Sequence, residues 1–272
     1  MLNIESGMYF CPSHWLDNTL RIALVGCGAT GSAIAPLLFK LNHIRREVTG
    51  REYGLNLFIF DPKNVTATGM NRTGFFATEV GLNKAQIMAN KLNTAYGQNF
   101  AVGYPRPFSG NDAGNRYDVI ITATDSAKSR YDIQHHVKQR HHGNRKSLWL
   151  DIGVGEQYGN VVLGEFGHGK HRLPNALDLF PSIASTSEDK ALKRNSCDVL
   201  DAITRQNFTV NEWGAAMAVG LLSRLMLNGS IKVQGSMYDV ETCGSTPIRI
   251  NRQMWRSFGY NYRKNPKQTT PA

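Results

Sequence analysis

The chain of 272 residues is 41% hydrophobic and 19% charged, a composition that excludes a disordered or fibrous protein and can support a sizeable core. Its 31 lysines and arginines exceed its 21 acidic residues and give a formal net charge of +10. No RNA-binding motif, helix-turn-helix or zinc finger accompanies this charge, which argues against nucleic acid and leaves an anionic substrate or an acidic partner. No signal peptide is apparent, and no apolar stretch approaches the ~20 residues of a membrane span, so we expect a cytoplasmic protein without membrane contact.

In the first half of the chain, apolar runs alternate with segments of helical apolar spacing. The predicted strands cover residues 21–26, 55–60, 101–108 and 117–123. The predicted helices cover residues 29–41, 82 to about 94 and about 127–141. Pro36 predicts a kink or an end to the first turns of its helix, and the prolines within 101–108 predict a strand at the sheet edge.

The second half of the chain follows a different pattern. Strands are predicted at 147–154 and 160–166, and a final hairpin at 236–241 and 247–251. A long polar segment with little periodicity, 167–208, precedes a strongly apolar helix. That helix is predicted over residues 212–227.

Together these elements predict an α/β fold. We expect a Rossmann-like, doubly wound, mostly parallel sheet with a mixed carboxyl-terminal extension. The expected organisation is an amino-terminal segment at 1–20, a single domain over 21–262 that contains the polar loop, and a disordered basic tail at 263–272.

A glycine-rich motif, G-x-G-x-x-G, directly follows the first strand and opens the first helix. Its glycines permit a tight turn and let backbone N–H groups approach a phosphate at the helix amino terminus. This spacing predicts a nucleotide site but does not distinguish NAD from ATP. The residues of the motif and its flank are Gly26, Cys27, Gly28, Ala29, Thr30, Gly31 and Ser32.

Charged residues after the neighbouring strands favour ATP over NAD. Asp61 ends the second strand, where a carboxylate can bind ribose hydroxyls, and Asp125 follows the strand at 117–123. Asn71 and Arg72 lie in the loop after Asp61, and Lys84 opens the next helix. The carboxyl ends of parallel strands meet at one crevice, so we expect these side chains to converge there. Phosphoryl or nucleotidyl transfer uses such cations on the polyphosphate and a carboxylate on Mg²⁺, whereas hydride transfer has no use for them.

The order of these motifs, GCGATGS, FD, NR, GLNK and TATDS, resembles the ThiF/MoeB/ubiquitin-activating superfamily. The resemblance covers roughly residues 21–166 and recurs around 206–227. The whole chain looks most like the stand-alone ThiF-related proteins of bacterial PRTRC cassettes. These proteins accompany ubiquitin-like, conjugating-enzyme-like and JAB-peptidase-like proteins.

The resemblance implies a role for each matching residue. Asp61 falls on the ribose-binding acid, and Asn71 and Arg72 fall on the family's pair in which the arginine contacts the triphosphate. Lys84 matches the lysine that contacts phosphate. Asp125 matches the carboxylate that organises Mg²⁺ and the reacting α-phosphate.

The chain also departs from the family's pattern. Thr68 and Gly69 stand where the family commonly has Ser-Asn, which removes one side-chain contact. The amino-terminal helix that can supply an arginine to a neighbouring subunit is replaced by a short segment. The two C-x-x-C pairs are absent, so we expect no structural zinc.

Cys197 lies in the polar segment, about where some family members carry a cysteine that accepts the activated acyl group. Lys193 and Arg194 nearby could lower its pKa, and a thiolate attacking an acyl-adenylate would give a thioester. The alternative is an ordinary thiol in a loop. Cys27, inside the glycine motif, is expected to pack within the fold.

By resemblance, the expected function is ATP-dependent adenylation of the carboxyl-terminal glycine of a ubiquitin-like protein, with ATP and Mg²⁺ and a homodimeric enzyme. A conjugating-enzyme-like protein is a further expected partner. Two alternatives remain open: an NAD-dependent Rossmann oxidoreductase, and a catalytically silent interaction module that keeps the fold to hold a partner.

Overall fold

The computed structural model describes residues 1–113, 117–140, 147–167, 172–184 and 207–262. In this part of the chain, eight strands form a central sheet in the order β11-β10-β8-β7-β6-β3-β4-β5. Neighbours from β5 to β7 pair in parallel, and those from β7 to β11 pair antiparallel. In chain order the strands are β3 (Leu20–Val25), β4 (Leu55–Phe60), β5 (Ala101–Tyr104), β6 (Val119–Thr122), β7 (Leu148–Val154), β8 (Tyr158–Glu165), β10 (Val233–Asp239) and β11 (Gly244–Arg249).

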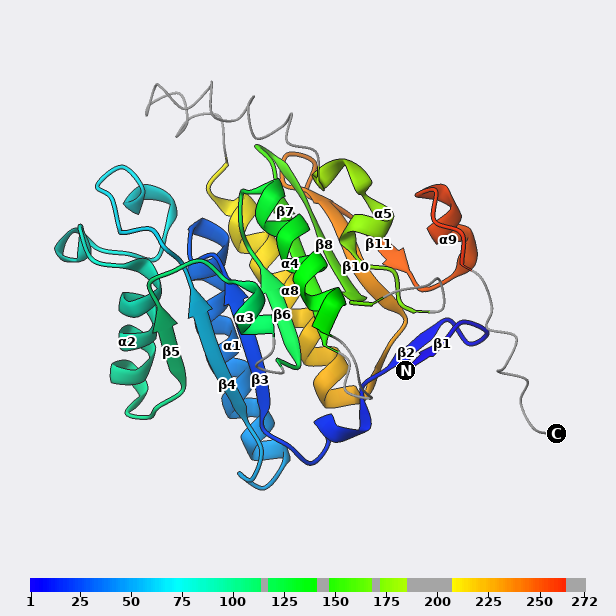
Figure 1. Cartoon of the computed structure of the whole chain (residues 1–272), viewed down its shortest axis with the longest axis horizontal. Coiled ribbons are helices and arrows are strands. Elements are labelled where there is room, and N and C mark those ends of the chain that lie inside the picture. The colour runs from blue at the N-terminus through cyan, green and yellow to red at the C-terminus, as the bar shows by residue number, and fades with distance from the viewer. Residues whose placement is uncertain (114–116, 141–146, 168–171, 185–206, 263–272) are drawn as a thin grey trace.

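This arrangement confirms the predicted fold class: a mostly parallel sheet continues into an antiparallel extension (Figure 1). The chain runs outward from β3 to β4 and β5, then returns to place β6 on the other side of β3. Such a reversal of strand order opens a crevice at the carboxyl ends of the strands. The first candidate place for a ligand therefore lies between the ends of β3, β4 and β6.

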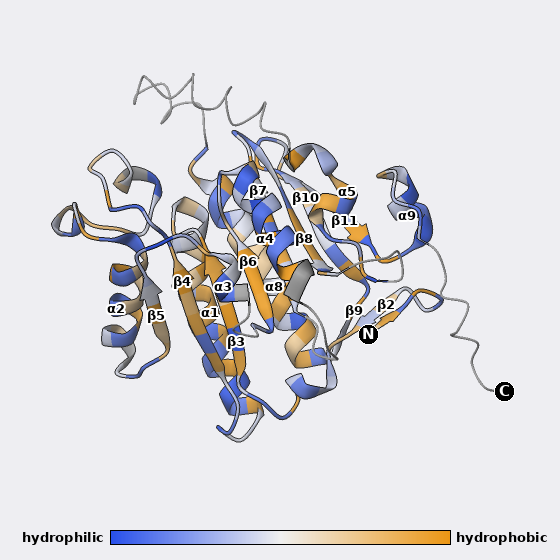
Figure 2. Ribbon diagram, viewed as in Figure 1, coloured by the Kyte–Doolittle hydropathy of each residue, from blue (hydrophilic) through white to orange (hydrophobic). Residues whose placement is uncertain are grey.

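Helices cover both faces of the sheet (Figure 1). The larger core cluster joins one face to α1 (Ala29–Val48), α2 (Lys84–Tyr96) and α8 (Thr209–Asn228). The smaller cluster joins the other face to α4 (Ala127–Arg140), and α3 (Gly110–Ala113) lies against α4. Because both faces are covered, β3 and β6 are apolar almost throughout, as their orange ribbons show in Figure 2.

Helix α1 is longer than its local pattern indicates. The predicted end at residue 41 was wrong, because the helix continues to Val48. Pro36 lies inside it without ending its first turns, although proline removes a backbone donor. The last turns are held by Arg45, which is buried and donates from Nη2 to the carbonyl oxygens of Trp15 and, at 2.9 Å, Asn18.

The amino-terminal segment is part of the folded structure. Its strands β1 (Leu2–Asn3) and β2 (Met8–Phe10) form a small antiparallel sheet with β9 (Ser230–Ile231), which follows α8. Tyr9 and Trp15 are each only 1% exposed. This long-range pairing explains why a segment without a recognisable local pattern is ordered.

The second half of the chain contains the predicted hairpin and several short helical elements. The predicted hairpin is present as β10 and β11, with boundaries shifted toward the amino terminus. Part of the predicted polar loop, 172–184, forms a helical turn, α5 (Ala176–Leu179), and a 3₁₀ turn; residues 168–171 and 185–206 lie outside the described residues. A last helix, α9 (Arg252–Ser257), follows β11, and the predicted tail at 263–272 also lies outside. No helix among the described residues is long and apolar enough to cross a membrane.

Candidate functional site

The carboxyl ends of three strands meet at the predicted crevice. The Gly26 amide after β3 donates to the Phe60 carbonyl at the end of β4 (2.9 Å). On the other side of β3, the Ala123 amide after β6 donates to the Val25 carbonyl (2.9 Å). The sequence-predicted site residues on these three turns are therefore brought together.

The three glycines of the motif have different reasons to be glycine. Gly26 has φ +93°, and a Cβ on it would lie 2.5 Å from the Ala123 carbonyl oxygen. A Cβ on Gly31 would lie 2.0 Å from the Gly26 carbonyl oxygen. A Cβ on Gly28 would meet nothing within 4 Å, and no side chain caps helix α1 at this N-cap position. Gly26 and Gly31 thus close the turn, while Gly28 leaves space at the positive end of the helix dipole.

Asp61 connects the ends of β3 and β4. It is 5% exposed. One carboxylate oxygen accepts from the Cys27 amide (2.7 Å) and the other from the Lys63 amide (2.8 Å). A carboxylate has about four lone-pair positions, so two remain for hydroxyl donors. Asp61 therefore also orients the glycine turn, a structural role that its sequence position did not indicate.

Lys84 is positioned by Asn83, which sequence reasoning missed. Asn83 caps α2, because its Oδ1 accepts from the amides of Ala85 (3.0 Å) and Gln86 (3.2 Å). Its Nδ2 donates to the Asp61 carbonyl (2.9 Å) and ties the helix start to the end of β4. The signal that could have found it is an asparagine directly before a helical period, the preferred N-cap residue.

The charge of Lys84 reaches the glycine turn. Burial raises the pKa of the Cys27 thiol far above its usual range, Asp61 raises it further, and the positive charge of Lys84 opposes both effects. Cys27 is fully buried and is therefore a packing residue, as expected. Lys84 itself is partly exposed and can turn toward a ligand in the crevice.

Asp125 lies just beyond β6 and faces solvent. Its side chain is 81% exposed, and its Oδ2 lies 3.6 Å from the Nζ of Lys63, whose side chain is 65% exposed. Next to it, the Ser126 hydroxyl accepts from the Ser129 amide (3.2 Å) at the start of α4. An exposed carboxylate near the glycine turn is a candidate for holding Mg²⁺, which proteins usually bind through one or two carboxylates plus substrate phosphates.

Asn71 and Arg72 lie in a 3₁₀ turn, η2 (Met70–Arg72), in the loop after β4. This loop is held against the first turn of α1 by Ser32, whose hydroxyl accepts from the Gly74 amide (3.1 Å) and donates to the Ala29 carbonyl (3.0 Å). Ser32 thus acts within the protein, and the loop that carries Arg72 borders the crevice.

The hydroxyl of Thr30 is used inside the protein. It donates to Oδ1 of Asn211 in α8 (2.8 Å), and both residues are buried. The backbone of Thr30 and Ala29 remains at the amino terminus of α1, where N–H groups can face a phosphate. Cys197, with Lys193 and Arg194, lies outside the described residues.

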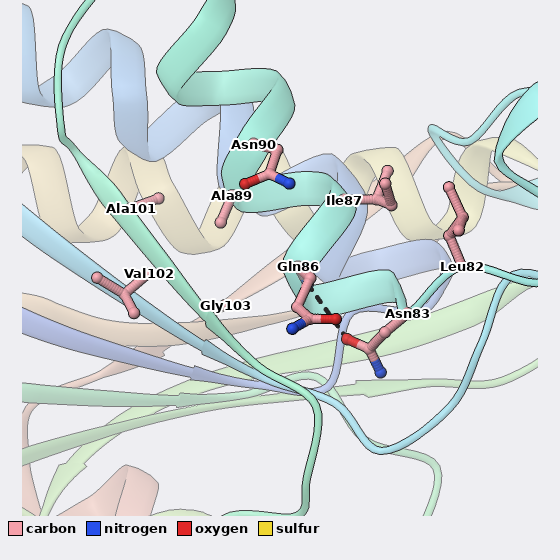
Figure 3. A pocket seen from close by; sticks show the side chains of 9 residues that line it. All are labelled: Leu82, Asn83, Gln86, Ile87, Ala89, Asn90, Ala101, Val102 and Gly103. Carbon is pink, nitrogen blue, oxygen red and sulfur yellow. Dashed lines mark hydrogen bonds between the residues drawn. The ribbon is translucent and has the colours of Figure 1, made fainter.

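A separate groove of about 490 Å³ lies between α2 and the edge strand β5 (Figure 3). It borders the candidate site only through Asn83 and contains none of the glycine turn, Asp61 or Asp125. Among the described residues, no group of three or more His, Cys, Asp or Glu could hold a metal ion alone. A divalent cation at Asp125 would accordingly depend on ligand oxygens.

Comparisons with known proteins agree with the fold. The sequence model of the ThiF family matches residues 16–254, whereas no curated protein matches the sequence significantly. The structure of E. coli MccB is similar over 88% of this chain and 64% of its own length, with a TM-score of 0.58 and 12% identity. The structure of E. coli MccB with ATP has a TM-score of 0.57 and 14% identity, over 88% of this chain and 66% of that one. PaaA has a TM-score of 0.59 and 14% identity, over 87% of this chain and 74% of its own.

Proposed function

Because the chain belongs to the ThiF family, we propose that it uses ATP to adenylate a carboxylate of its substrate. The observation that carries the proposal is the open space at Gly28, in a turn that Asp61 orients and that the charge of Lys84 reaches. Asp125 lies beyond the end of β6, the neighbour of β3 in the sheet. The structure of the similar protein E. coli MccB with ATP supports ATP as the ligand. This chain spans just under two thirds of the length of MccB, so the activity is inferred from this chain's own residues and family.

In the proposed reaction, a substrate carboxylate oxygen attacks the α-phosphorus of ATP. A new oxygen–phosphorus bond forms, and the bond from the α-phosphorus to the β-phosphate oxygen breaks. Pyrophosphate leaves with the electron pair, and an acyl-adenylate remains bound. No proton has to be moved, so the protein contributes positioning and charge neutralisation.

Four of the predicted residues have a place in this reaction. Asp61 accepts from ribose hydroxyls with the lone pairs left by its two backbone donors. Arg72 and Lys84 neutralise charge on the phosphates, and Asp125 holds Mg²⁺. Bound Mg²⁺ would neutralise charge on the triphosphate and on departing pyrophosphate. Backbone N–H groups at the start of α1 face the phosphates without a competing side-chain cap.

The substrate we propose is the carboxyl-terminal glycine of a ubiquitin-like protein, and the order of motifs supports this class. The similar enzyme MccB has been solved in complex with N-formylated MccA, which supports a separate molecule as the substrate. The same proposal includes transfer of the acyl group to Cys197 and a conjugating-enzyme-like partner. It also includes a homodimer and a cytoplasmic location. The positive net charge of +10 suits an acidic partner.

The first experiment compares Mg·ATP with NAD as stabilising ligands. A ligand at about 100 times its Kd stabilises the folded state by about 2.7 kcal/mol, enough for a clear shift in melting temperature. We expect a shift with Mg·ATP alone, weakened in Lys84→Ala and Asp125→Ala. The control is Lys128→Ala, which removes an exposed lysine paired with Asp132 on α4.

The alternatives give different results. A shift in melting temperature with NAD alone would contradict adenylation and support the NAD-dependent oxidoreductase hypothesis. No shift with either nucleotide would favour the catalytically silent interaction module. An equal Mg·ATP shift in wild type, Lys84→Ala and Asp125→Ala would place ATP somewhere other than this crevice.

A further inference from the structure

Lys63 is a site residue that the sequence motifs did not single out. It lies two residues beyond Asp61, and its backbone is held on both sides. Its amide donates to Asp61 Oδ1 (2.8 Å), and its carbonyl accepts from the Lys84 amide (3.1 Å) and from Asn83 Nδ2 (3.2 Å). The position of its Cα is therefore fixed by the same contacts that orient Asp61 and start α2.

The side chain of Lys63 extends toward the loop after β6. It starts at the end of β4, and its Nζ lies 3.6 Å from Asp125 Oδ2 beyond the end of β6. β3 lies between β4 and β6 in the sheet, so the ends of these two strands are about two strand spacings, ~10 Å, apart. The Lys63 side chain and the loop that carries Asp125 together bridge this distance. β3, the strand between β4 and β6, continues into the turn that begins at Gly26.

The contact between Lys63 and Asp125 is not a structural clamp. The two side chains are 65% and 81% exposed, and their 3.6 Å separation is longer than a charge-assisted hydrogen bond. Exposed ion pairs of this kind add little to folding stability. Both charges can therefore change partner when a charged ligand enters the crevice.

We propose that Lys63 binds the α-phosphate of ATP and of the adenylate product, an inference that rests on the proposed function. Asp61 would hold the ribose, and Asp125 would hold the cation on the triphosphate. Lys63 lies between them, with its amide on Asp61 and its Nζ beside Asp125. In ATP the α-phosphate links the ribose to the β- and γ-phosphates. It is therefore the group expected between Asp61 and Asp125, next to Lys63.

A cation at this phosphate helps the chemical step. The attacking carboxylate and the α-phosphate are both negative, so their approach is repelled in the absence of a nearby positive charge. Lys63 Nζ would reduce this repulsion and stabilise charge on the non-bridging oxygens of the α-phosphate in the transition state. When pyrophosphate has left, the ammonium group would remain on the adenylate.

The test uses AMP, Mg·ADP and Mg·ATP as probes, with dissociation constants measured by titration calorimetry. Lys63→Ala is expected to weaken all three by about the same factor, roughly tenfold for one charge-assisted hydrogen bond. Lys84→Ala is expected to weaken Mg·ADP and Mg·ATP more than AMP. Lys63→Arg should recover part of the affinity, and Lys128→Ala should match the wild type, because its lysine lies in an exposed pair on α4.

Three results would overturn the inference. Lys63→Ala with wild-type affinities would make Lys63 a surface lysine, and a loss confined to Mg·ADP and Mg·ATP would place it on the outer phosphates. Tighter binding in Lys63→Ala would mean that Lys63 only competes for Asp125. If the wild type binds these nucleotides and Lys84→Ala weakens them, the proposed function stands whatever Lys63 does. If the wild type binds none, the proposed function and this inference both fail.

Discussion

The crevice and the antiparallel half of the sheet use polar side chains in opposite ways. At the crevice, Lys63 and Asp125 face solvent and share one long contact. In the antiparallel half, Arg172 donates to Asp178 (2.6 and 2.9 Å) and to the Glu165 carbonyl (3.0 Å). Gln234, fully buried, accepts from the Trp255 indole N–H (2.7 Å) and donates to the Pro174 carbonyl (2.9 Å).

This difference predicts which substitutions change folding stability and which change ligand binding. A buried polar group that is paired within the protein costs much to disturb, because its partner is then left unpaired and out of water. A charge that faces solvent costs little to remove and keeps its bonding capacity for a ligand. Substitutions in the antiparallel half should therefore change unfolding, and those in the crevice should change nucleotide binding.

The largest expected effect is on stability, from Arg172→Ala. Breaking the ion pair leaves Asp178 without its charged partner in a largely buried place, so we expect a loss of about 3–5 kcal/mol in the free energy of unfolding. Urea unfolding measures it. The matched control is Arg51→Ala, whose exposed pair with Glu47 should cost less than about 0.5 kcal/mol. A loss of Mg·ATP affinity in folded Arg172→Ala would contradict the assignment of stability to the antiparallel half and nucleotide binding to the crevice.

Asp125→Ala should show the reverse pattern. We expect the affinity for Mg·ATP to fall about 100-fold, or about 2.7 kcal/mol, because the carboxylate that would hold Mg²⁺ is removed. The free energy of unfolding should stay within about 0.5 kcal/mol of the wild type, since the side chain is 81% exposed. Calorimetry and urea unfolding on the same preparations measure both. Repeating the titration without Mg²⁺ should remove most of the difference, and a persistent difference would contradict a cation role.

Two glycines of one motif should separate the two effects within a single turn. Gly31→Ala forces a Cβ to within 2.0 Å of the Gly26 carbonyl oxygen, so we expect a loss of about 2 kcal/mol or more in unfolding free energy. The Cβ of Gly28→Ala meets nothing within 4 Å, so the variant should lose only the N-cap preference for glycine over alanine, about 0.5–1 kcal/mol. Its methyl group would occupy the space in front of α1, and the affinity for Mg·ATP should fall about tenfold. Equal affinity in Gly28→Ala and wild type would place the phosphates elsewhere.

The smallest expected effect concerns Asp112, which is buried in the parallel half but lies in α3 between β5 and β6. Burial alone would raise its pKa, but hydrogen bonds from Arg106 and Ser109 outweigh this and lower the pKa of the carboxyl below its ordinary value. A lowered folded-state pKa stabilises the fold above the unfolded pKa of about 3.9, and this stability is lost as pH falls through the folded value. Asp112→Asn should therefore cost about 1 kcal/mol at about pH 7 and progressively less below about pH 4, with unchanged Mg·ATP affinity. A pH-independent difference in urea unfolding would argue against the ionised pair.

Local pattern predicted the strands and the order of the site residues. The strand at 55–60 is found with the same boundaries as β4, because an apolar run between Gly54 and Asp61 has a sharp beginning and end. The strands that precede Asp61 and Asp125 both flank β3, as the predicted strand order requires. The end of α1 was missed because Arg45 is charged, and a charged residue gives no local sign that carbonyl groups of residues 15 and 18 will bury it.

The sequence by itself determined the glycine turn, the strands around it and the charged residues that follow each strand, because those properties depend on neighbours along the chain. Only the tertiary structure decided which polar groups are used inside the protein and which stay open. Thr30 finds its partner Asn211 at a separation of 181 residues, and Lys63 reaches Asp125 from another strand. Whether a polar side chain has a hydrogen-bond partner within the protein depends on contacts between residues far apart in the chain, which local sequence patterns do not show. At this site, those contacts separate the residues that hold the turn from the residues left to bind a ligand.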